Sequence, residues 1–280
     1  MKINQLLKKA TKKIAHISPT SQLDSEIILT QVLKKNHSFL LAHPEKIVSK
    51  KKVDKFFSLI KKRELSEPIA YIIGKKEFFG LNFLINKNVL IPREETEILV
   101  KKVINFFKHK KKGALIDLGT GSGAIAISIA KHIASSIDIK AIDICKKALN
   151  LAQKNAHNLA TKNINFLQSD LLQNISFQNK SLPLVIVANL PYIGQNEVLE
   201  KSVLNFEPSK ALFAGEKGLD LYDRLFEDLS KRKINFTKLF FEFAPEQKNY
   251  FQKILKQFFP NRNISFFKDL SGRFRGGEIE

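Results

Sequence analysis

The sequence predicts an α/β protein with a small helical domain at its N-terminus and a mostly parallel sheet after it. Two observations lead to this prediction. Apolar residues recur at helical spacing through the first 75 residues, and after Gly113 short apolar runs alternate with amphipathic stretches. Apolar strands separated by helices are typical of parallel sheets that are covered on both faces. A chain of 280 residues with 44% hydrophobic content is long enough for two domains with a core each.

The helical domain is expected over residues 1–75. Ser21 and Ser49 stand where helix N-caps are favoured, and Pro44 and Pro68 interrupt the helical pattern. The apolar positions at helical spacing are Ile3, Leu6, Leu7, Ala10, Ile14 and Ile17, then Leu23, Ile27, Ile28 and Val32, then Val53, Phe56, Phe57 and Ile60.

The period changes between Phe78 and Ile91. Residues 79–83 and 89–91 resemble two short strands around Asn86-Lys87-Asn88. We therefore interpret residues 76–92 as a hairpin linker between the domains.

The second domain is expected over residues 93–280. It should begin with a helix, because Pro92 suits a first helical turn and Glu94, Glu95 and Glu97 favour the positive end of the helix dipole. Seven strands are expected, the last two as an antiparallel pair, at residues 114–118, 137–142, 164–168, 184–189, 239–243, 264–267 and 273–279. Helices are expected from Gly123, over residues 146–159 and over residues 247–258.

Composition limits the environment and the partners. The net charge of +20 suits an acidic partner, but Lys-, Asn- and Phe-rich stretches also arise from composition bias, so both interpretations stay open. Cys145 is the one cysteine and cannot form an internal disulfide, which favours a reducing, cytoplasmic environment. We expect no signal peptide and no membrane helix, because no apolar run reaches about 18 residues. We expect no metal site, since the six histidines are scattered.

A glycine-rich turn follows the first expected strand of the second domain, with the sequence Gly119-Thr120-Gly121-Ser122-Gly123. Glycines at such a turn let a ligand approach the backbone closely. Asp143 lies 22 residues past Gly121, at the end of the next strand, where a carboxylate can accept hydrogen bonds from ribose hydroxyls. The pattern predicts a nucleoside-bearing cofactor but leaves its identity open, because Gly119-x-Gly121-x-x-Ala124 also fits the dinucleotide fingerprint.

A second polar segment, Asn189-Leu190-Pro191-Tyr192, follows the buried strand at residues 184–189. It suits methylation of a planar nitrogen, which is a weak nucleophile until acceptors hold its N–H groups. The Asn189 side-chain oxygen and the Leu190 carbonyl can be these acceptors, while Tyr192 can stack on the planar group and Pro191 can fix the turn.

These motifs together resemble a class I S-adenosylmethionine-dependent methyltransferase with a Rossmann-like seven-stranded sheet. More narrowly, the chain resembles the PrmC/HemK family, which methylates the side-chain amide nitrogen of the glutamine in the Gly-Gly-Gln motif of peptide chain release factors. The resemblance extends from about Arg63 to the C-terminus, and the helical front half fits the family's substrate-recognition domain. It also rests on Arg63, Glu67 to Gly74, Phe78 to Leu81, Leu90 to Glu97, Glu207-Pro208, Ala211-Leu212, Gly215, Gly218 to Asp220 and Asp269 to Arg273.

The resemblance implies a role for each part of the site. Residues Gly119 to Gly123 would hold the methionine part of the cofactor, Asp143 its ribose, and Asp170-Leu171 its adenine. Asn189 would lie between cofactor and substrate, and Asn189, Leu190, Pro191 and Tyr192 would bind the glutamine and carry the catalysis. The family has Asn-Pro-Pro-Tyr where this chain has Asn-Leu-Pro-Tyr, so Leu190 replaces the first proline. Leucine supplies the same main-chain carbonyl.

The Leu190 departure keeps a second hypothesis open. The ribosomal RNA adenine dimethyltransferases resemble this chain at Asn-Leu-Pro-Tyr, and a charge of +20 suits RNA. Against an rRNA adenine N6-methyltransferase stand the helical front domain and residues Ile91 to Glu97, which have no counterpart there. RNA binding is neither required nor excluded by the charge. A catalytically idle cofactor-binding protein ranks third, because Asn189, Pro191 and Tyr192 are intact.

The charged turn after Pro92 also has two interpretations. Arg93, Thr96 and Glu97 either close over the cofactor or cap the helix that follows.

Overall fold

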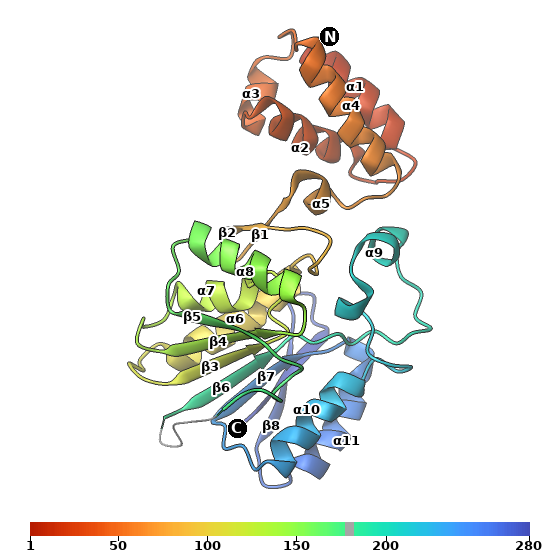
Figure 1. The fold of residues 1–280 in the computed structure, drawn as a ribbon. Coiled ribbons are helices and arrows are strands. Elements are labelled where there is room, and N and C mark those ends of the chain that lie inside the picture. The colour runs from red at the N-terminus through yellow and green to blue at the C-terminus, as the bar shows by residue number, and fades with distance from the viewer. Residues whose placement is uncertain (177–181) are drawn as a thin grey trace. The chain divides into compact units, whose positions relative to one another are not determined.

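The computed structural model describes residues 1–176 and 182–280, and these form two compact units (Figure 1). One unit contains Met1–Lys75 and Leu199–Phe206, and the other contains Lys76–Val198 and Glu207–Glu280. The candidate site lies entirely in the second unit.

The first unit is a bundle of short helices. Its core is a face of apolar side chains at helical spacing, of which Ile3, Leu6 and Phe56 are fully buried. Burial of this face stabilises helices that would be marginal alone. The helices are α1 (Ile3–Ile14), α2 (Ser21–Leu33), α3 (His37–Ala42), α4 (Lys50–Glu64), α5 (Ile69–Ile73) and α9 (Lys201–Phe206).

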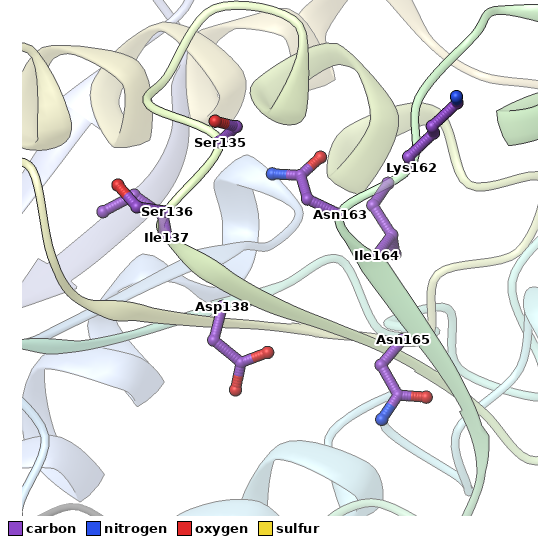
Figure 2. Close-up of a pocket in the computed structure, with 8 residues that line it drawn as sticks. All are labelled: Ser135, Ser136, Ile137, Asp138, Lys162, Asn163, Ile164 and Asn165. Carbon is purple, nitrogen blue, oxygen red and sulfur yellow. The ribbon is translucent and has the colours of Figure 1, made fainter.

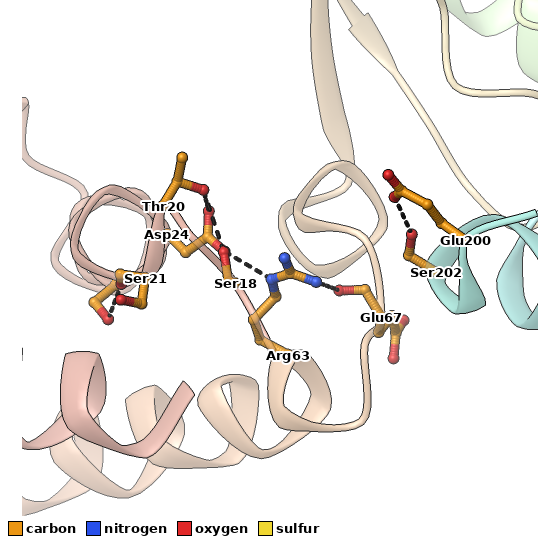
Figure 3. A network of polar contacts seen from close by, with 9 residues as sticks. Ser18, Thr20, Ser21, Asp24, Arg63, Glu67, Glu200 and Ser202 are labelled. Carbon is orange, nitrogen blue, oxygen red and sulfur yellow. Dashed lines mark hydrogen bonds and ion pairs between the residues drawn. The ribbon is translucent and has the colours of Figure 1, made fainter. Parts of the chain in front are cut away.

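A buried ion pair joins α2 to the end of α4 (Figure 3). Arg63 Nε donates to Asp24 Oδ2 at 2.7 Å, and the two side chains are 14% and 8% exposed. The Asp24 carboxylate also accepts from Ser18 Oγ at 2.7 Å and Thr20 Oγ1 at 3.2 Å. Arg63, one of the residues that carry the family resemblance, therefore holds the bundle together.

Replacing Arg63 by alanine should destabilise the helical unit, because it leaves the Asp24 carboxylate buried without its cation. Breaking a buried pair costs about 3 kcal/mol or more. Lys13→Ala is the matched control, since the Lys13–Glu64 pair is 42% and 31% exposed and exposed pairs contribute less than about 1 kcal/mol. Urea unfolding of the full chain, monitored by circular dichroism, measures the stability that each variant loses. Equal losses in the two variants would contradict this account.

The hairpin lies earlier in the chain than the sequence predicted. The strands are β1 (Lys75–Phe78) and β2 (Leu81–Leu84), and the turn between them is Phe79-Gly80, where both φ angles are positive (51° and 70°). The prediction of strands around Asn86 to Asn88 is wrong. Asn86 forms a local turn there instead, because its side-chain oxygen accepts from the Asn88 backbone at 2.9 Å.

The second unit is built on the predicted seven-stranded sheet. The strand order is β5-β4-β3-β6-β7-β9-β8, with the first five strands parallel and β9 antiparallel to both β7 and β8. The strands are β3 (Ala114–Leu118), β4 (Asp138–Asp143), β5 (Ile164–Gln168), β6 (Leu184–Ala188), β7 (Lys238–Glu242), β8 (Ile264–Lys268) and β9 (Phe274–Ile279). The class I methyltransferase architecture expected from the resemblance is confirmed.

Helices cover both faces of this sheet, as Figure 1 shows. One face carries α6, α7 and α8, and the other carries α10 and α11. Their bounds are α6 (Glu97–Phe107), α7 (Ala124–Ala130), α8 (Lys146–Asn158), α10 (Asp220–Lys231) and α11 (Lys248–Phe258), with short 3-10 turns η1 (Glu94–Thr96), η2 (Ser209–Ala211) and η3 (Pro245–Gln247). In the described residues we find no helix long and apolar enough to cross a membrane.

The register of the sheet brings the predicted motifs to one edge. Leu118, the last residue of β3, pairs with Ile142 of β4 and with Ala188 of β6. The residues that follow these strands therefore leave the sheet side by side. In an open α/β sheet this carboxyl-terminal edge is where ligands bind.

Candidate active site

The glycine-rich turn leaves β3 at this edge in a conformation that favours glycine. Gly119, Gly121 and Gly123 have φ angles of 71°, 56° and 82°, a region that costs other residues roughly 1–2 kcal/mol each. A Cβ at Gly121 would have only the Gly119 carbonyl near it, at 3.9 Å, whereas one at Gly123 would lie 2.7 Å from Ile127. Gly121 therefore faces open space that a ligand can use, while Gly123 allows close helix packing.

Asp143 lies beside the turn, as the sequence predicted. Its Oδ2 accepts the Gly121 N–H at 2.9 Å, and its Oδ1 accepts the Cys145 N–H at 2.8 Å. Burial raises the pKa of this carboxyl group, and the two N–H groups counter the rise. Each oxygen keeps a lone pair, so the carboxylate can still accept from two hydroxyl groups.

Asp117, the residue before Leu118, is fully buried and was not predicted as a site residue. Its Oδ2 accepts from Thr120 Oγ1 at 2.7 Å and from the Ala126 N–H at 3.2 Å, which holds the turn against α7. Its Oδ1 has no hydrogen-bond partner among the described residues. Burial raises the pKa of Asp117 to about 7.

Asn155 of α8 is a further residue that sequence analysis missed. It is 1% exposed, and its side chain joins two separate segments by hydrogen bonds. It exchanges two hydrogen bonds with the Leu84 backbone, at 2.8 and 3.0 Å, and donates to the Ser122 carbonyl at 2.9 Å. A polar residue on a helix face that is otherwise apolar was the available signal.

The predicted adenine contacts lie after β5, next to the end of β4. Leu171 has a positive φ of 49° and packs partly buried against the core. The Asp170 carboxylate is paired with Arg224 of α10 at 2.7 Å. Ile144, directly after Asp143, is 57% exposed. An exposed isoleucine at this edge offers an apolar contact that the sequence analysis did not include.

Asn189 follows β6, and its carboxamide is oriented by the protein. Its Nδ2 donates to Thr96 Oγ1 at 3.0 Å, and Thr96, in the turn after Pro92, is only 4% exposed. Because the nitrogen end faces Thr96, the oxygen end is turned away from it and can accept from a ligand.

Leu190 connects this segment to the glycine turn and to α10. Its side chain is 4% exposed, and its Cδ2 lies 3.2 Å from the position that a Cβ on Gly119 would take. Its backbone N–H donates to the Tyr222 hydroxyl at 3.3 Å. The same hydroxyl lies 3.1 Å from the Ala188 carbonyl and 2.5 Å from the Glu242 carbonyl. Tyr222 therefore fixes the backbone whose carbonyl is the expected second acceptor.

The Leu190–Tyr222 hydrogen bond is one that proline at position 190 cannot make, since proline has no N–H. Tyr222→Phe should therefore cost more stability in the natural sequence than in a Leu190→Pro background. The difference should be about 0.5–1.5 kcal/mol, the net contribution of one hydrogen bond. Urea unfolding of the four proteins gives this coupling energy, and a value of zero would contradict the role given to Tyr222.

Tyr192 is held at both its hydroxyl and its carbonyl. The hydroxyl donates to Glu242 Oε1 at 3.2 Å, and the carbonyl accepts from Gln247 Nε2 at 2.8 Å. Gly218 lies against the same carbonyl, and a Cβ there would be 2.2 Å from it. Burial raises the pKa of Tyr192 well above its usual value, and the Glu242 charge adds to this. Tyr192 therefore stays neutral, and Pro191 beside it is partly exposed.

The charged turn after Pro92 does not cap the helix that follows, because neither Arg93 nor Thr96 makes a side-chain cap hydrogen bond. Arg93 is ion-paired with the buried Glu207 at 2.5 Å, and Glu207 also accepts the Ile91 N–H at 3.1 Å. Glu97 accepts the Phe79 N–H of the hairpin turn at 2.8 Å. These contacts place Thr96 against Asn189.

A surface hollow of about 390 Å³ lies at the opposite edge of the sheet (Figure 2). It is lined by residues before and within the starts of β4 and β5, including Ser136, Asp138 and Asn163. Asn189 and the glycine turn lie at the other ends of the strands, so this hollow is separate from the candidate site.

The residues at the site fit an S-adenosylmethionine molecule. The open space at Gly121, the unpartnered Oδ1 of Asp117 and the remaining acceptor capacity of Asp143 suit a ligand with an amino acid tail and a ribose. Ile144 and Leu171 suit the apolar faces of a base.

Comparisons with known proteins identify both parts of the chain. The PrmC N-terminal domain family matches residues 5–74, and a methyltransferase domain family matches residues 109–257.

Curated relatives match the chain over nearly its whole length. The release factor glutamine methyltransferase of Buchnera aphidicola subsp. Schizaphis graminum is 37% identical over 98% of this chain and 98% of the relative. That of Coxiella burnetii is 35% identical over 96% of each chain.

Solved structures support the fold. The catalytic domain of hMettl16, crystallised with MAT2A 3′UTR hairpin 1, matches 86% of this chain and 84% of that chain with a TM-score of 0.59 at 14% identity. At that identity the likeness is one of fold. The identity and coverage of the curated relatives go further, and the chain belongs to the release factor glutamine methyltransferase family.

Proposed function

We propose that this protein transfers the methyl group of S-adenosylmethionine to the side-chain amide nitrogen of a glutamine in the Gly-Gly-Gln motif of peptide chain release factors. The family membership supports this reaction. We further propose that the protein acts in translation termination in the cytoplasm. The observation that carries the proposal is the oriented carboxamide of Asn189, whose nitrogen is held by Thr96 at 3.0 Å.

The cofactor would bind along the edge formed by β3, β4 and β5. Residues Gly119, Thr120, Gly121, Ser122 and Gly123 would hold its amino acid tail, and Asp143 would accept from its ribose hydroxyls. Asp170 and Leu171 would lie by the base, with Ile144 as an added apolar contact. When bound, S-adenosylmethionine supplies a methyl group on a positively charged sulfur, which makes the methyl carbon electrophilic.

The chain's own residues would position the glutamine. The Asn189 side-chain oxygen and the Leu190 carbonyl would accept the two amide N–H groups, and Tyr192 would lie against the planar amide with Pro191 fixing the turn. Acceptors on both N–H groups raise the electron density on the nitrogen and aim it in line with the methyl carbon. The protein contributes position rather than a strong base. The amide loses its proton after the methyl group has been transferred, when that proton is acidic.

We further propose that residues 1–75 recognise the release factor. The match of residues 5–74 to the PrmC N-terminal domain supports this assignment. The charge of +20 suits an acidic protein surface as well as RNA.

The test supplies labelled methyl donor to the purified protein with three acceptors. These are a release factor, the same factor with the glutamine of its Gly-Gly-Gln motif changed to alanine, and ribosomal RNA. Label should enter the first acceptor alone. Label in the RNA alone would replace the proposal with an RNA adenine methyltransferase, and label in the alanine factor would mean that another residue is modified.

A further inference from the structure

Glu242 is a buried carboxylate that neither the motifs nor the resemblance assigns a role. It is the last residue of β7 and is 1% exposed. Its Oε1 accepts from the Tyr192 hydroxyl at 3.2 Å, and its Oε2 is buried without a hydrogen-bond partner among the described residues. The Thr96 hydroxyl faces the same carboxylate and stabilises its charged form. Glu242 therefore lies beside Thr96, which binds Asn189, and beside Tyr192.

The number of hydrogens on each group determines which group donates and which accepts in this cluster. The Thr96 oxygen already accepts from Asn189 Nδ2 at 3.0 Å, so its single hydrogen must point elsewhere. The Glu242 carboxylate is an anionic acceptor that carries no hydrogen of its own. The hydrogen bond therefore runs from Asn189 to Thr96. The Thr96 hydrogen is left to point toward the Glu242 carboxylate, whose Oε2 has no other partner among the described residues. This direction turns the oxygen end of the Asn189 carboxamide away from Thr96.

The opposite direction of these hydrogen bonds would remove the Asn189 acceptor from the substrate amide. A protonated Glu242 can donate to the Thr96 oxygen, and the Thr96 hydrogen can then point at Asn189. The Asn189 carboxamide would flip to accept it and would present its NH₂ group to the substrate. Two NH₂ groups facing one another form no hydrogen bond.

We propose that Glu242 is a positioning residue, which acts through the Thr96 hydroxyl to keep the oxygen of Asn189 turned toward the substrate amide. The inference rests on the proposed function for its consequence in catalysis. The orientation itself can be measured without any substrate.

The surroundings make this carboxylate sensitive to pH. Burial raises the pKa of Glu242 to about 7, Thr96, Arg275 and Tyr192 oppose the rise, and the charge of Glu95 adds to it. Because the pKa is raised, Glu242 is charged above about pH 7 and takes up a proton as the pH falls through that value. The groups that face it come from η1 (Glu95 and Thr96), the loop after β6 (Tyr192), α10 (Tyr222) and β9 (Arg275).

The direct test follows the side-chain NH₂ signals of Asn189 in the full chain labelled with ¹⁵N-asparagine. The signals are assigned by their absence from the Asn189→Asp variant. In the natural protein they should shift with a midpoint near pH 7, the value to which burial raises the pKa of Glu242. In Glu242→Gln the shift should disappear. Signals that titrate alike in both proteins would overturn the proposal, whether or not a release factor is methylated.

The kinetic test compares variants that keep or remove the Glu242 carboxylate and the Thr96 hydroxyl. Glu242→Gln and Thr96→Val should each lower kcat by about 10- to 100-fold, the loss expected for one hydrogen bond to a charged group, with cofactor affinity within about threefold. The double variant should be no slower than Thr96→Val, because both changes break one chain. Thr96→Ser keeps the hydroxyl and should restore most of the rate, which a purely structural role would not require.

Glu278→Gln is the matched control. Glu278 is a partly buried carboxylate of the neighbouring strand β9 that pairs with Lys102 at 2.9 Å, away from the loop after β6. The Glu278→Gln substitution should leave kcat unchanged. Additive losses in the double variant, or equal effects of Glu278→Gln and Glu242→Gln, would show that Glu242 only supports the sheet. A natural protein that methylates no release factor but shows the NMR titration would refute the proposed function and leave the orientation of Asn189 established.

Discussion

Replacing Asn189 by alanine is expected to lower kcat by about 10²- to 10³-fold, the cost of removing one preorganised partner from the reacting group. In the proposed function the side-chain oxygen of Asn189 accepts from the substrate amide. The hydrogen bond from Asn189 Nδ2 to Thr96 Oγ1, at 3.0 Å, orients the carboxamide for this contact. Alanine leaves one N–H of the glutamine amide without its acceptor. Single-turnover methylation of a release factor with labelled donor measures the rate of the chemical step.

Cofactor affinity should change much less, within about threefold, because the glycine turn and Asp143 remain intact. Calorimetric titration with S-adenosylmethionine measures this affinity. Asn165→Ala is the control, since Asn165 is an exposed asparagine in β5. If Asn189→Ala methylates at the natural rate, or if its whole loss appears in cofactor binding, the role proposed for Asn189 is wrong.

The sheet could be predicted because its strands are apolar along their length. Strands β3 and β5 have the predicted bounds, β6, β8 and β9 differ by one residue at one end, and β4 and β7 are shifted by one residue. Helix α10 was not predicted, although Tyr222, Leu225, Phe226 and Leu229 recur at helical spacing and are buried. The hairpin was misplaced because Asn86 to Asn88 is a strong local turn signal, while the true turn at Phe79 depends on a non-glycine residue with positive φ.

The site could be predicted where it consists of short motifs or of a residue at a fixed spacing from one, as Asp143 is from Gly121. The glycine turn and Asn189 to Tyr192 are short motifs, and sheet topology brings them together as expected. Thr96, Tyr222 and Glu242 come from three distant segments, and each is one ordinary polar residue within an apolar or charged stretch. Their roles depend on which strands become neighbours, which local sequence does not state.

Replacing Gly121 by valine should weaken the binding of S-adenosylmethionine by at least about 100-fold, which corresponds to a loss of about 2.7 kcal/mol. A side chain at this position would enter the space beside the turn, where only the Gly119 carbonyl lies near, at 3.9 Å. The protein itself therefore leaves room for an added Cβ at this position, and the cofactor would not.

The positive φ of Gly121, 56°, adds a strain of roughly 1–2 kcal/mol for a valine, and this strain must be separated from the blocked site. Gly272→Val is the matched control, because Gly272 has a φ of 81°, no atom within 4 Å of an added Cβ, and a place in the turn between β8 and β9. Both variants should lose similar stability in urea unfolding, and only Gly121→Val should lose the cofactor in calorimetry. If Gly121→Val binds S-adenosylmethionine as tightly as Gly272→Val does, the glycine turn does not hold the cofactor, and the position of Asn189 beside a reactive methyl group has no support.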